Sequence, residues 1–224
     1  MENNVSLWYA SIPEWLSAIG TISAVLIALF QKSIRQWWNK PNIKVTCNKN
    51  NPCVEEIKED TQSSSVSKEI RLRVKLENTG NYIANNCLMI IDSYYAKRED
   101  GAYVITEFTP KQMKDYRGAN ISYVAPHLNY YYDILTIHQF DEIGNVSDAG
   151  HQKQFFKPSI IGDGKAINLK KGTYIIPLKF YSSKLPTVTT YLKLFWNSDD
   201  CTTDSRYFDY NIISEKEFKA IKKS

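Results

Sequence analysis

The three histidines are the first residues to consider for acid–base or metal chemistry. They are His127, His138 and His151. None has another histidine at the three-to-five-residue spacing of a zinc site, and none belongs to an H-E-x-x-H motif. We therefore interpret them as surface or strand-end residues.

Other patterns for catalysis or phosphate binding are incomplete. The chain has no G-x-S-x-G nucleophile turn, and residues 160–165, IIGDGK, lack the full spacing of a phosphate-binding loop. The adjacent carboxylates Asp199 and Asp200 suit a hard cation, but we favour a solvated loop. We expect no catalytic residue, no metal and no cofactor, and enzymatic activity ranks behind the two functions set out below.

Four cysteines are present: Cys47, Cys53, Cys87 and Cys201. Cys47 and Cys53 have five residues between them, more than the two to four of a zinc knuckle. Cys87 lies in an apolar run and suits a small buried side chain. Two disulfides are the alternative, but a domain of this size does not need them, so we expect free thiols.

The charge balance argues against nucleic acid as a partner. The chain has 28 Lys and Arg against 24 Asp and Glu, a net charge of +4. Nucleic-acid-binding domains cluster basic residues on one face or along one helix. No such cluster is evident in the β-rich part of this sequence, so we expect no nucleic-acid binding.

Residues 12–30, IPEWLSAIGTISAVLIALF, form an apolar stretch in which only Glu14 is charged. As a helix they span about 28 Å at ~1.5 Å per residue, close to the hydrocarbon thickness of a bilayer. Ser11 and Glu14 fit a capping box at the helix start. We predict a transmembrane helix at 12–30 after an extracytoplasmic tail at 1–11. The alternatives are a helix buried on every side and a signal peptide, whose basic leader is missing.

Charged and aromatic residues at the two ends of this stretch predict its orientation. Basic residues follow it, and they stay on the cytoplasmic side. We therefore predict a single-pass protein of the inner (cytoplasmic) membrane, with its N-terminus outside and its C-terminal domain in the cytoplasm. Aromatic belts and basic flanks mark the interfaces. The expected membrane-interface residues are Trp8, Trp15, Lys32, Arg35, Trp37, Trp38 and Lys40.

Small residues recur along one face of the predicted helix. Gly20, Ala24 and Ala28 are four residues apart, a spacing that lets two helices approach closely in lipid. Self-association through this seam and an ordinary membrane-helix composition are both open. Residues 31–41 form a basic juxtamembrane segment, either an amphipathic extension on anionic headgroups or a stop-transfer flank. Pro41 ends the helix in either case.

Strand patterns dominate from residue 42 onward. Residues 70–76, IRLRVKL, alternate strictly, which places Arg71, Arg73 and Lys75 on a solvent face. The other predicted strands are 43–47, 87–95, 103–108, 130–137, 173–181, 188–196 and 207–212. The predicted turn is 77–81, and the predicted loops are 54–69 and 141–166.

Two later strands, 173–181 and 188–196, form a predicted hairpin. Pro177 removes a ladder donor, so its strand is expected at an edge or bulged. Short strands joined by turns predict a mainly β protein, with an immunoglobulin-like β-sandwich over 42–214 and a charged tail over 215–224 in which a helix is one alternative. A partly open barrel is the runner-up.

The run IRLRVKLENTGNYIANNCLMIID, residues 70–92, resembles the strand pair of immunoglobulin-like domains of the CARDB type. Asn78 and Gly80 match the N-x-G turn, and Ala84 and Asn86 match the A-x-N stretch. The layout is also similar to bacterial single-pass proteins of unknown function whose N-terminal helix has the pattern seen at 15–25. The resemblance implies a sandwich fold and no catalytic residue.

Two functions from different classes follow from these parts. The first is a membrane-anchored, non-enzymatic binding module, whose β domain holds a protein partner or a small-molecule ligand. The second is a membrane-disrupting effector of a bacterial defence system, in which ligand binding in the cytoplasm drives helix oligomerisation. Both use the bilayer as a partner. They differ in whether the helix sequence itself matters.

Overall fold

The computed structural model divides the chain into two compact units, Met1–Lys40 and Pro41–Ser224. The sequence placed the start of the β domain at residue 42. The structure describes the backbone of residues 5–38, 40–50, 52–59, 67–141, 154–162, 165–183, 185–197 and 208–223.

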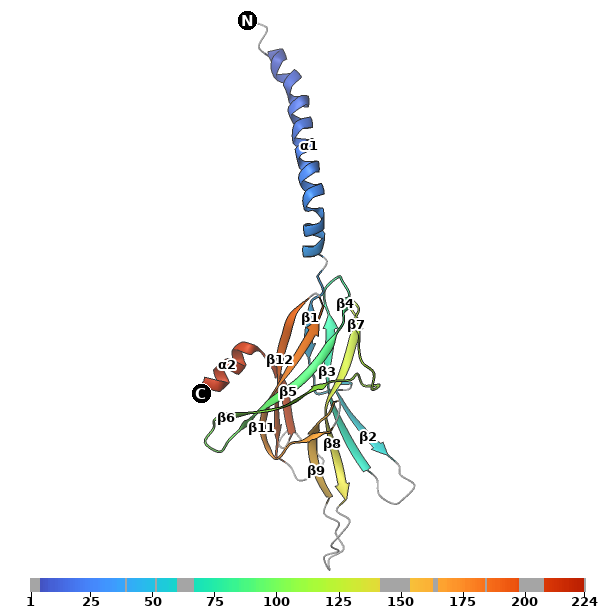
Figure 1. Ribbon diagram of the computed structural model, residues 1–224, viewed down its shortest axis with the longest axis vertical. Coiled ribbons are helices and arrows are strands. Elements are labelled where there is room, and N and C mark those ends of the chain that lie inside the picture. The colour runs from blue at the N-terminus through green and yellow to red at the C-terminus, as the bar shows by residue number, and fades with distance from the viewer. Residues whose placement is uncertain are drawn as a thin grey trace, which may run out of the picture. The chain divides into compact units, whose positions relative to one another are not determined.

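The first unit is one continuous helix, α1 (Val5–Trp38) (Figure 1). Residues 12–30 are therefore helical, as predicted, but the helix begins upstream of Ser11. The predicted capping box at Ser11 is wrong, because residues 5–10 contain no breaker and continue the helix. Over the residues that the structure describes, no helix has the length and apolarity needed to cross a membrane. The membrane-spanning part of the prediction thus gains no support from the structure.

Every described side chain of α1, at positions 15–31 and 33, is exposed. Large apolar residues are among them: Ile27 is 62% exposed and Leu29 is 70% exposed. A helix that is apolar on all sides is normally covered by protein or lipid. The described chain supplies no cover for these residues.

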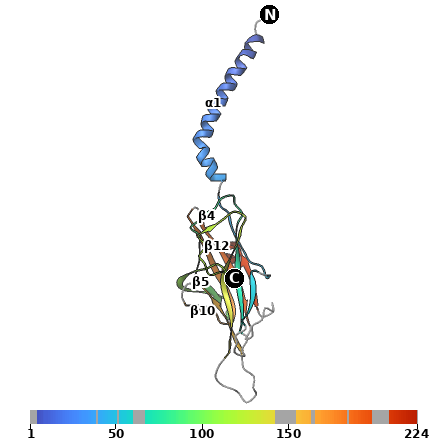
Figure 2. The same cartoon turned by 90° about the vertical axis from the view of Figure 1, so that its right-hand side faces the viewer.

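The second unit is mainly β, as predicted, and contains two larger sheets (Figures 1 and 2). The first has the order β1-β3-β8-β9-β10, and β2 also pairs with β3. Its strands are β1 (Ile43–Thr46), β2 (Val54–Glu59), β3 (Ser67–Asn78), β8 (Asn129–Asp141), β9 (Gln154–Ile160) and β10 (Ile167–Asn168).

The second sheet has the order β13-β12-β11-β5-β6, and β4 pairs with β7 in a small separate ladder. The strands are β4 (Ala84–Asn85), β5 (Leu88–Lys97), β6 (Tyr103–Gln112), β7 (Tyr123–Val124), β11 (Gly172–Ser182), β12 (Leu185–Trp196) and β13 (Phe208–Ile213). The chain then forms α2 (Glu215–Lys223), so the predicted charged tail is a helix.

One hydrophobic core joins the two larger sheets. On β3 the predicted inward residues, Ile70, Leu72, Val74 and Leu76, are all fully buried. They belong to the same cluster as buried residues of the second sheet, Trp196 and Phe180 among them. This arrangement is sandwich-like, because each sheet buries one face against the other.

The structure corrects the two predicted loops and one of the two positions expected for Pro177. The predicted loops 54–69 and 141–166 contain β2, the start of β3, and β9. The loop predictions rested on the serine-rich, polar composition of 54–69 and on the four glycines of 141–166. Pro177 was expected at an edge or a bulge. The edge position is wrong, because β11 lies between β12 and β5, but the β11–β5 register shifts between Ile175 and Lys179, as the bulge alternative predicted.

Asn78 organises the predicted turn after β3. Its side chain is fully buried and donates to Tyr82 O at 2.7 Å and Val124 O at 3.1 Å. Its Oδ1 accepts from the backbone N–H groups of Asn42 at 3.0 Å and Gly80 at 3.1 Å. The N-x-G motif therefore joins the start of β1, the turn and β7 through one saturated amide.

Candidate ligand-binding cleft

A β-bulge in β8 places two polar side chains on the outer face of the first sheet. Leu72 of β3 pairs with Leu135, whereas Arg73 pairs with Asp133, so the register shifts by one residue at Ile134. Ile134 and Leu135 both point into the core and are fully buried. As a result, Asp133 and Thr136 both lie on the outer face, which strict alternation would not allow.

Arg73 lies at the centre of an ion-pair network on this face. Its Nε donates to Asp133 Oδ1 at 2.5 Å, and its Nη2 lies 2.5 Å from Glu55 Oε2 on β2. The sequence placed Arg73 on a solvent face. Only 4% of the residue is exposed, because the carboxylates of β2 and β8 and the ring of Tyr116 cover it.

Residues 115–119 lie beside the Arg73 network and are held in a tight turn. Asp115 is 3% exposed and accepts from the backbone N–H groups of Arg117 at 3.0 Å and Ala119 at 2.8 Å. Its other oxygen accepts from Arg117 Nε at 3.1 Å. The guanidinium groups of Arg73 and Arg117 lie 5.4 and 5.3 Å from the centre of the Tyr116 ring. These are cation–π distances, so both arginines orient Tyr116.

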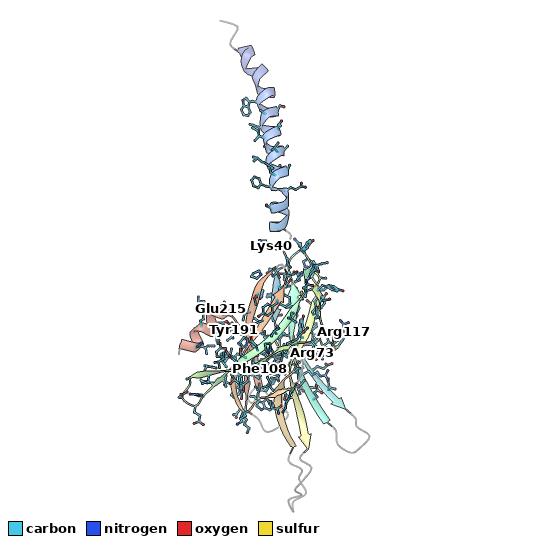
Figure 3. All side chains as sticks on the ribbon, in the orientation of Figure 1. Lys40, Arg73, Phe108, Arg117, Tyr191 and Glu215 are labelled. Atoms are coloured by element: carbon cyan, nitrogen blue, oxygen red, sulfur yellow. The ribbon has the colours of Figure 1, made fainter. Side chains whose placement is uncertain are left out.

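A cleft of about 530 Å³ opens beside this network. Both signs of charge line it, and Asp133 and Thr136, on either side of the β8 bulge, are among its lining residues. Its charged lining residues are Glu69, Arg71, Lys114, Asp115, Arg117 and Asp133. Figure 3 places Arg73 and Arg117 toward the right of the β unit and Tyr191 toward the left. The volume falls in the range of small-molecule sites.

Thr136 is a lining residue of the cleft whose hydroxyl is not satisfied by a hydrogen bond within the described chain. The residue is 3% exposed. A buried hydroxyl without a partner costs about 1–3 kcal/mol. A ligand that hydrogen-bonds to this hydroxyl would recover that cost.

Two carboxyl groups near Arg73 differ in environment. Burial raises the pKa of Asp133 above its usual range, in spite of the hydrogen bond from Arg73. Asp115 accepts two backbone hydrogen bonds and one from the guanidinium of Arg117. The cleft therefore offers charge-assisted hydrogen bonds at fixed positions. Such a set can orient a polar ligand.

The residues predicted for helix packing and for the membrane interfaces all belong to the first unit. Gly20, Ala24 and Ala28 are exposed on α1, and apart from the neighbouring helix backbone no described atom lies within 4 Å of a Cβ built at Gly20. Trp15 and Lys40 are exposed. The side chains of the remaining interface residues lie outside the described ones: Trp8, Lys32, Arg35, Trp37 and Trp38.

The other residues considered for chemistry do not come together. His127 is exposed, whereas the side chains of His138, His151, Asp199 and Asp200 lie outside the described residues. Cys47, Cys53 and Cys87 are free thiols. Within the described part of the chain, no group of three potential metal ligands is present.

Sequence reasoning missed the cleft, although one signal for it was present. In YYYDILTI, residues 130–137, two adjacent apolar residues separate Asp133 from Thr136. Such a break in alternation is the pattern of a bulge. The covering segment around Tyr116 carried no comparable signal, because its place beside β8 depends on contacts distant in sequence.

Comparison of the chain with protein-family models, with curated proteins and with solved structures returned no match.

Proposed function

We propose that this protein is a membrane-anchored, non-enzymatic binding module. The helix α1 attaches it to the inner membrane, and the cytoplasmic β unit takes up a small polar ligand in the cleft beside Arg73. The observation that carries the binding function is Thr136, which lines the cleft and whose buried hydroxyl has no partner among the described residues.

Membrane attachment is supported by the sequence and exposure of α1. The apolar stretch runs from residue 12 to 30, and its side chains are described from Trp15 onward. Those side chains are exposed on every side of the helix. Lipid would cover all of them at once, and the basic residues after Phe30 favour a cytoplasmic C-terminal unit.

An immunoglobulin-like fold is supported by strand order. In constant-type immunoglobulin domains, strands A, B and E are neighbours in one sheet and C, F and G in the other. The orders β1-β3-β8 and β5-β11-β12 follow the same scheme. The departure is β9, which follows β8 in sequence and occupies the place of strand D.

The binding proposal is tested by replacing Thr136 with valine, which keeps the shape and removes the hydroxyl. The purified protein is dialysed to equilibrium against a protein-free small-molecule extract, and bound molecules are identified by mass spectrometry. Tyr132→Phe is the matched control, because its hydroxyl is also buried without a described partner but does not line the cleft. We expect the wild type and Tyr132→Phe to retain a polar molecule that Thr136→Val loses. Equal retention by the wild type and both variants, or no retention by the wild type, would refute the proposal.

Attachment and orientation are tested separately. After detergent-free lysis the protein should sediment with membranes; a protein that stays in the supernatant contradicts the anchor. A thiol reagent that cannot cross membranes should leave all four cysteines unlabelled in intact cells. Labelling of Cys47 or Cys201 there would reverse the proposed orientation.

A membrane-disrupting effector is the second candidate function. The observation that favours it is the open surface at Gly20, which leaves room for a second helix along Gly20, Ala24 and Ala28. Gly20→Leu should then weaken oligomers in detergent, whereas Leu26→Ala, on another face, should not. Replacement of α1 by an unrelated membrane helix should abolish an effector and preserve a binding module.

A further inference from the structure

Two cysteines meet where the chain makes a short excursion from the edge of β3. The strands β1 and β2 both pair with the same edge of β3, one after the other. Thr46 is opposite Lys75, and Val54 is opposite Leu72. The chain therefore leaves this edge at Cys47 and returns to it at Cys53. The two cysteines are thus close to the same part of β3, with five residues between them in sequence.

Both cysteines form a hydrogen bond with the backbone of one residue, Arg73. The Cys47 thiol lies 3.1 Å from Arg73 O, and the Arg73 N–H donates to Cys53 O at 2.7 Å. The two thiols are also close enough to act on each other's pKa. Cys53 is 2% exposed and Cys47 is half-buried.

The surroundings favour a thiolate at one of the two sulfurs. The hydrogen bond from Cys47 lowers the pKa of Cys53 to about 6, and the positive charges of Lys75 and Arg73 act in the same direction. The same contact, together with burial, raises the pKa of Cys47. The phenol of Tyr210 also faces this pair from β13. A thiolate beside a second thiol is the arrangement of a redox-active pair.

We propose that Cys47 and Cys53 form a reversible dithiol–disulfide site, a function separate from ligand binding in the cleft, and that a small peroxide is its oxidant. The Cys53 thiolate attacks one oxygen of hydrogen peroxide, the O–O bond breaks, and hydroxide leaves. The resulting sulfenic acid is attacked by Cys47. The S–O bond breaks, the disulfide forms, and the proton of Cys47 leaves with the oxygen as water. Each cysteine sulfur is oxidised by one electron, and the peroxide is reduced by two.

The size of the oxidant follows from the burial of Cys53. Peroxide is small enough to reach a buried sulfur, whereas a peptide disulfide is not. Both cysteines contact the backbone of Arg73 on β3, the strand whose Glu69 and Arg71 line the cleft. Cys87 differs: burial raises its pKa to about 11, and its thiol donates to Ala84 O at 3.2 Å.

The test treats the full-length protein in detergent with hydrogen peroxide at neutral pH. Remaining thiols are blocked with N-ethylmaleimide, and the protein is digested with trypsin without reduction. Lys49 lies between the two cysteines, so the two fragments stay joined only through a disulfide. We expect one joined peptide, lighter by two hydrogen atoms than its parts, that dithiothreitol separates.

Two variants make the result specific. In Cys47→Ser the joined peptide should disappear, and dimedone should trap a sulfenic acid at Cys53. Cys87→Ser should form the joined peptide as the wild type does. A disulfide that uses Cys201, a disulfide between two chains, or oxidation of Cys87 at the same rate as Cys53 would overturn the proposal.

Discussion

Replacement of Arg73 by methionine tests whether the outer face of the first sheet is organised as described. Methionine keeps most of the length of the side chain and removes the charge. Asp133, whose side chain is 12% exposed, then loses its main partner, whereas Glu55, at 39%, can turn to solvent. Removal of one partner of a buried ion pair costs about 3–5 kcal/mol.

In the variant, Asp133 can avoid an unpaired buried charge by taking up a proton. The free energy of that protonation is therefore an upper limit to the loss of stability. An unfolded aspartate has a pKa near 3.9, so neutralising it at pH 7 costs about 4 kcal/mol, at ~1.36 kcal/mol per pH unit. At pH 5 the same limit is about 1.5 kcal/mol. The pKa of Asp133 in the folded variant lies above its unfolded value. The stability of the variant therefore rises as the pH falls from the folded to the unfolded pKa of Asp133.

The assay is urea unfolding of full-length protein in mild detergent, at pH 7 and at pH 5. Arg73→Met should lose about 3–4 kcal/mol at pH 7, or roughly 10 °C in Tm, and about half of that or less at pH 5. The double variant Arg73→Met/Asp133→Leu should recover most of the loss. Lys75→Met is the matched control, because Lys75 lies on the same strand in a more exposed pair with Glu77; it should lose under about 1 kcal/mol. A loss at Arg73 no larger than at Lys75 would refute the buried network.

Three further predictions concern the stability of the two units. Asn78→Ala removes four hydrogen bonds from a fully buried amide and should lower the free energy of unfolding by about 2–4 kcal/mol in urea titrations; an unchanged midpoint would contradict its role. Phe218→Ala removes a ring stacked 4.3 Å from that of Tyr191, so hydrogen exchange should show α2 released while β11 stays protected. Deletion of residues 1–40 should leave a soluble, cooperatively folding β unit; an insoluble product would mean that α1 belongs to the same fold.

Local patterns were sufficient for much of the β unit. The alternation in 70–76 correctly predicted four inward residues of β3, because side chains of a strand alternate strictly between its faces. The helix α2 also had a signal that was overlooked. Ser214 and Glu217 form a capping box, with Ser214 N donating to Glu217 Oε2 at 2.6 Å and Glu217 N to Ser214 Oγ at 3.2 Å.

Polar strands and outer-face burial were not predicted. β2, VEEIKE, packs Val54 against the core and carries Glu55 toward Arg73, but four of its six residues are charged, so periodicity gave little indication of it. Likewise, the burial of Arg73 depends on β2, on Asp133 and on the Tyr116 segment, which are brought together only by folding.

By itself, then, the sequence determined the helix over 12–30, the mainly β unit and the inward face of β3. These follow from residue type and spacing along short segments, where geometry has a fixed period. Tertiary structure alone decided the cleft at Thr136 and the meeting of Cys47 with Cys53. Both depend on strand register: a single-residue bulge brings Asp133 and Thr136 to one face, and two strands on one edge bring the cysteines together. The adjacent apolar residues Ile134 and Leu135 indicate a bulge, but which residues of two strands face each other depends on segments far apart in sequence.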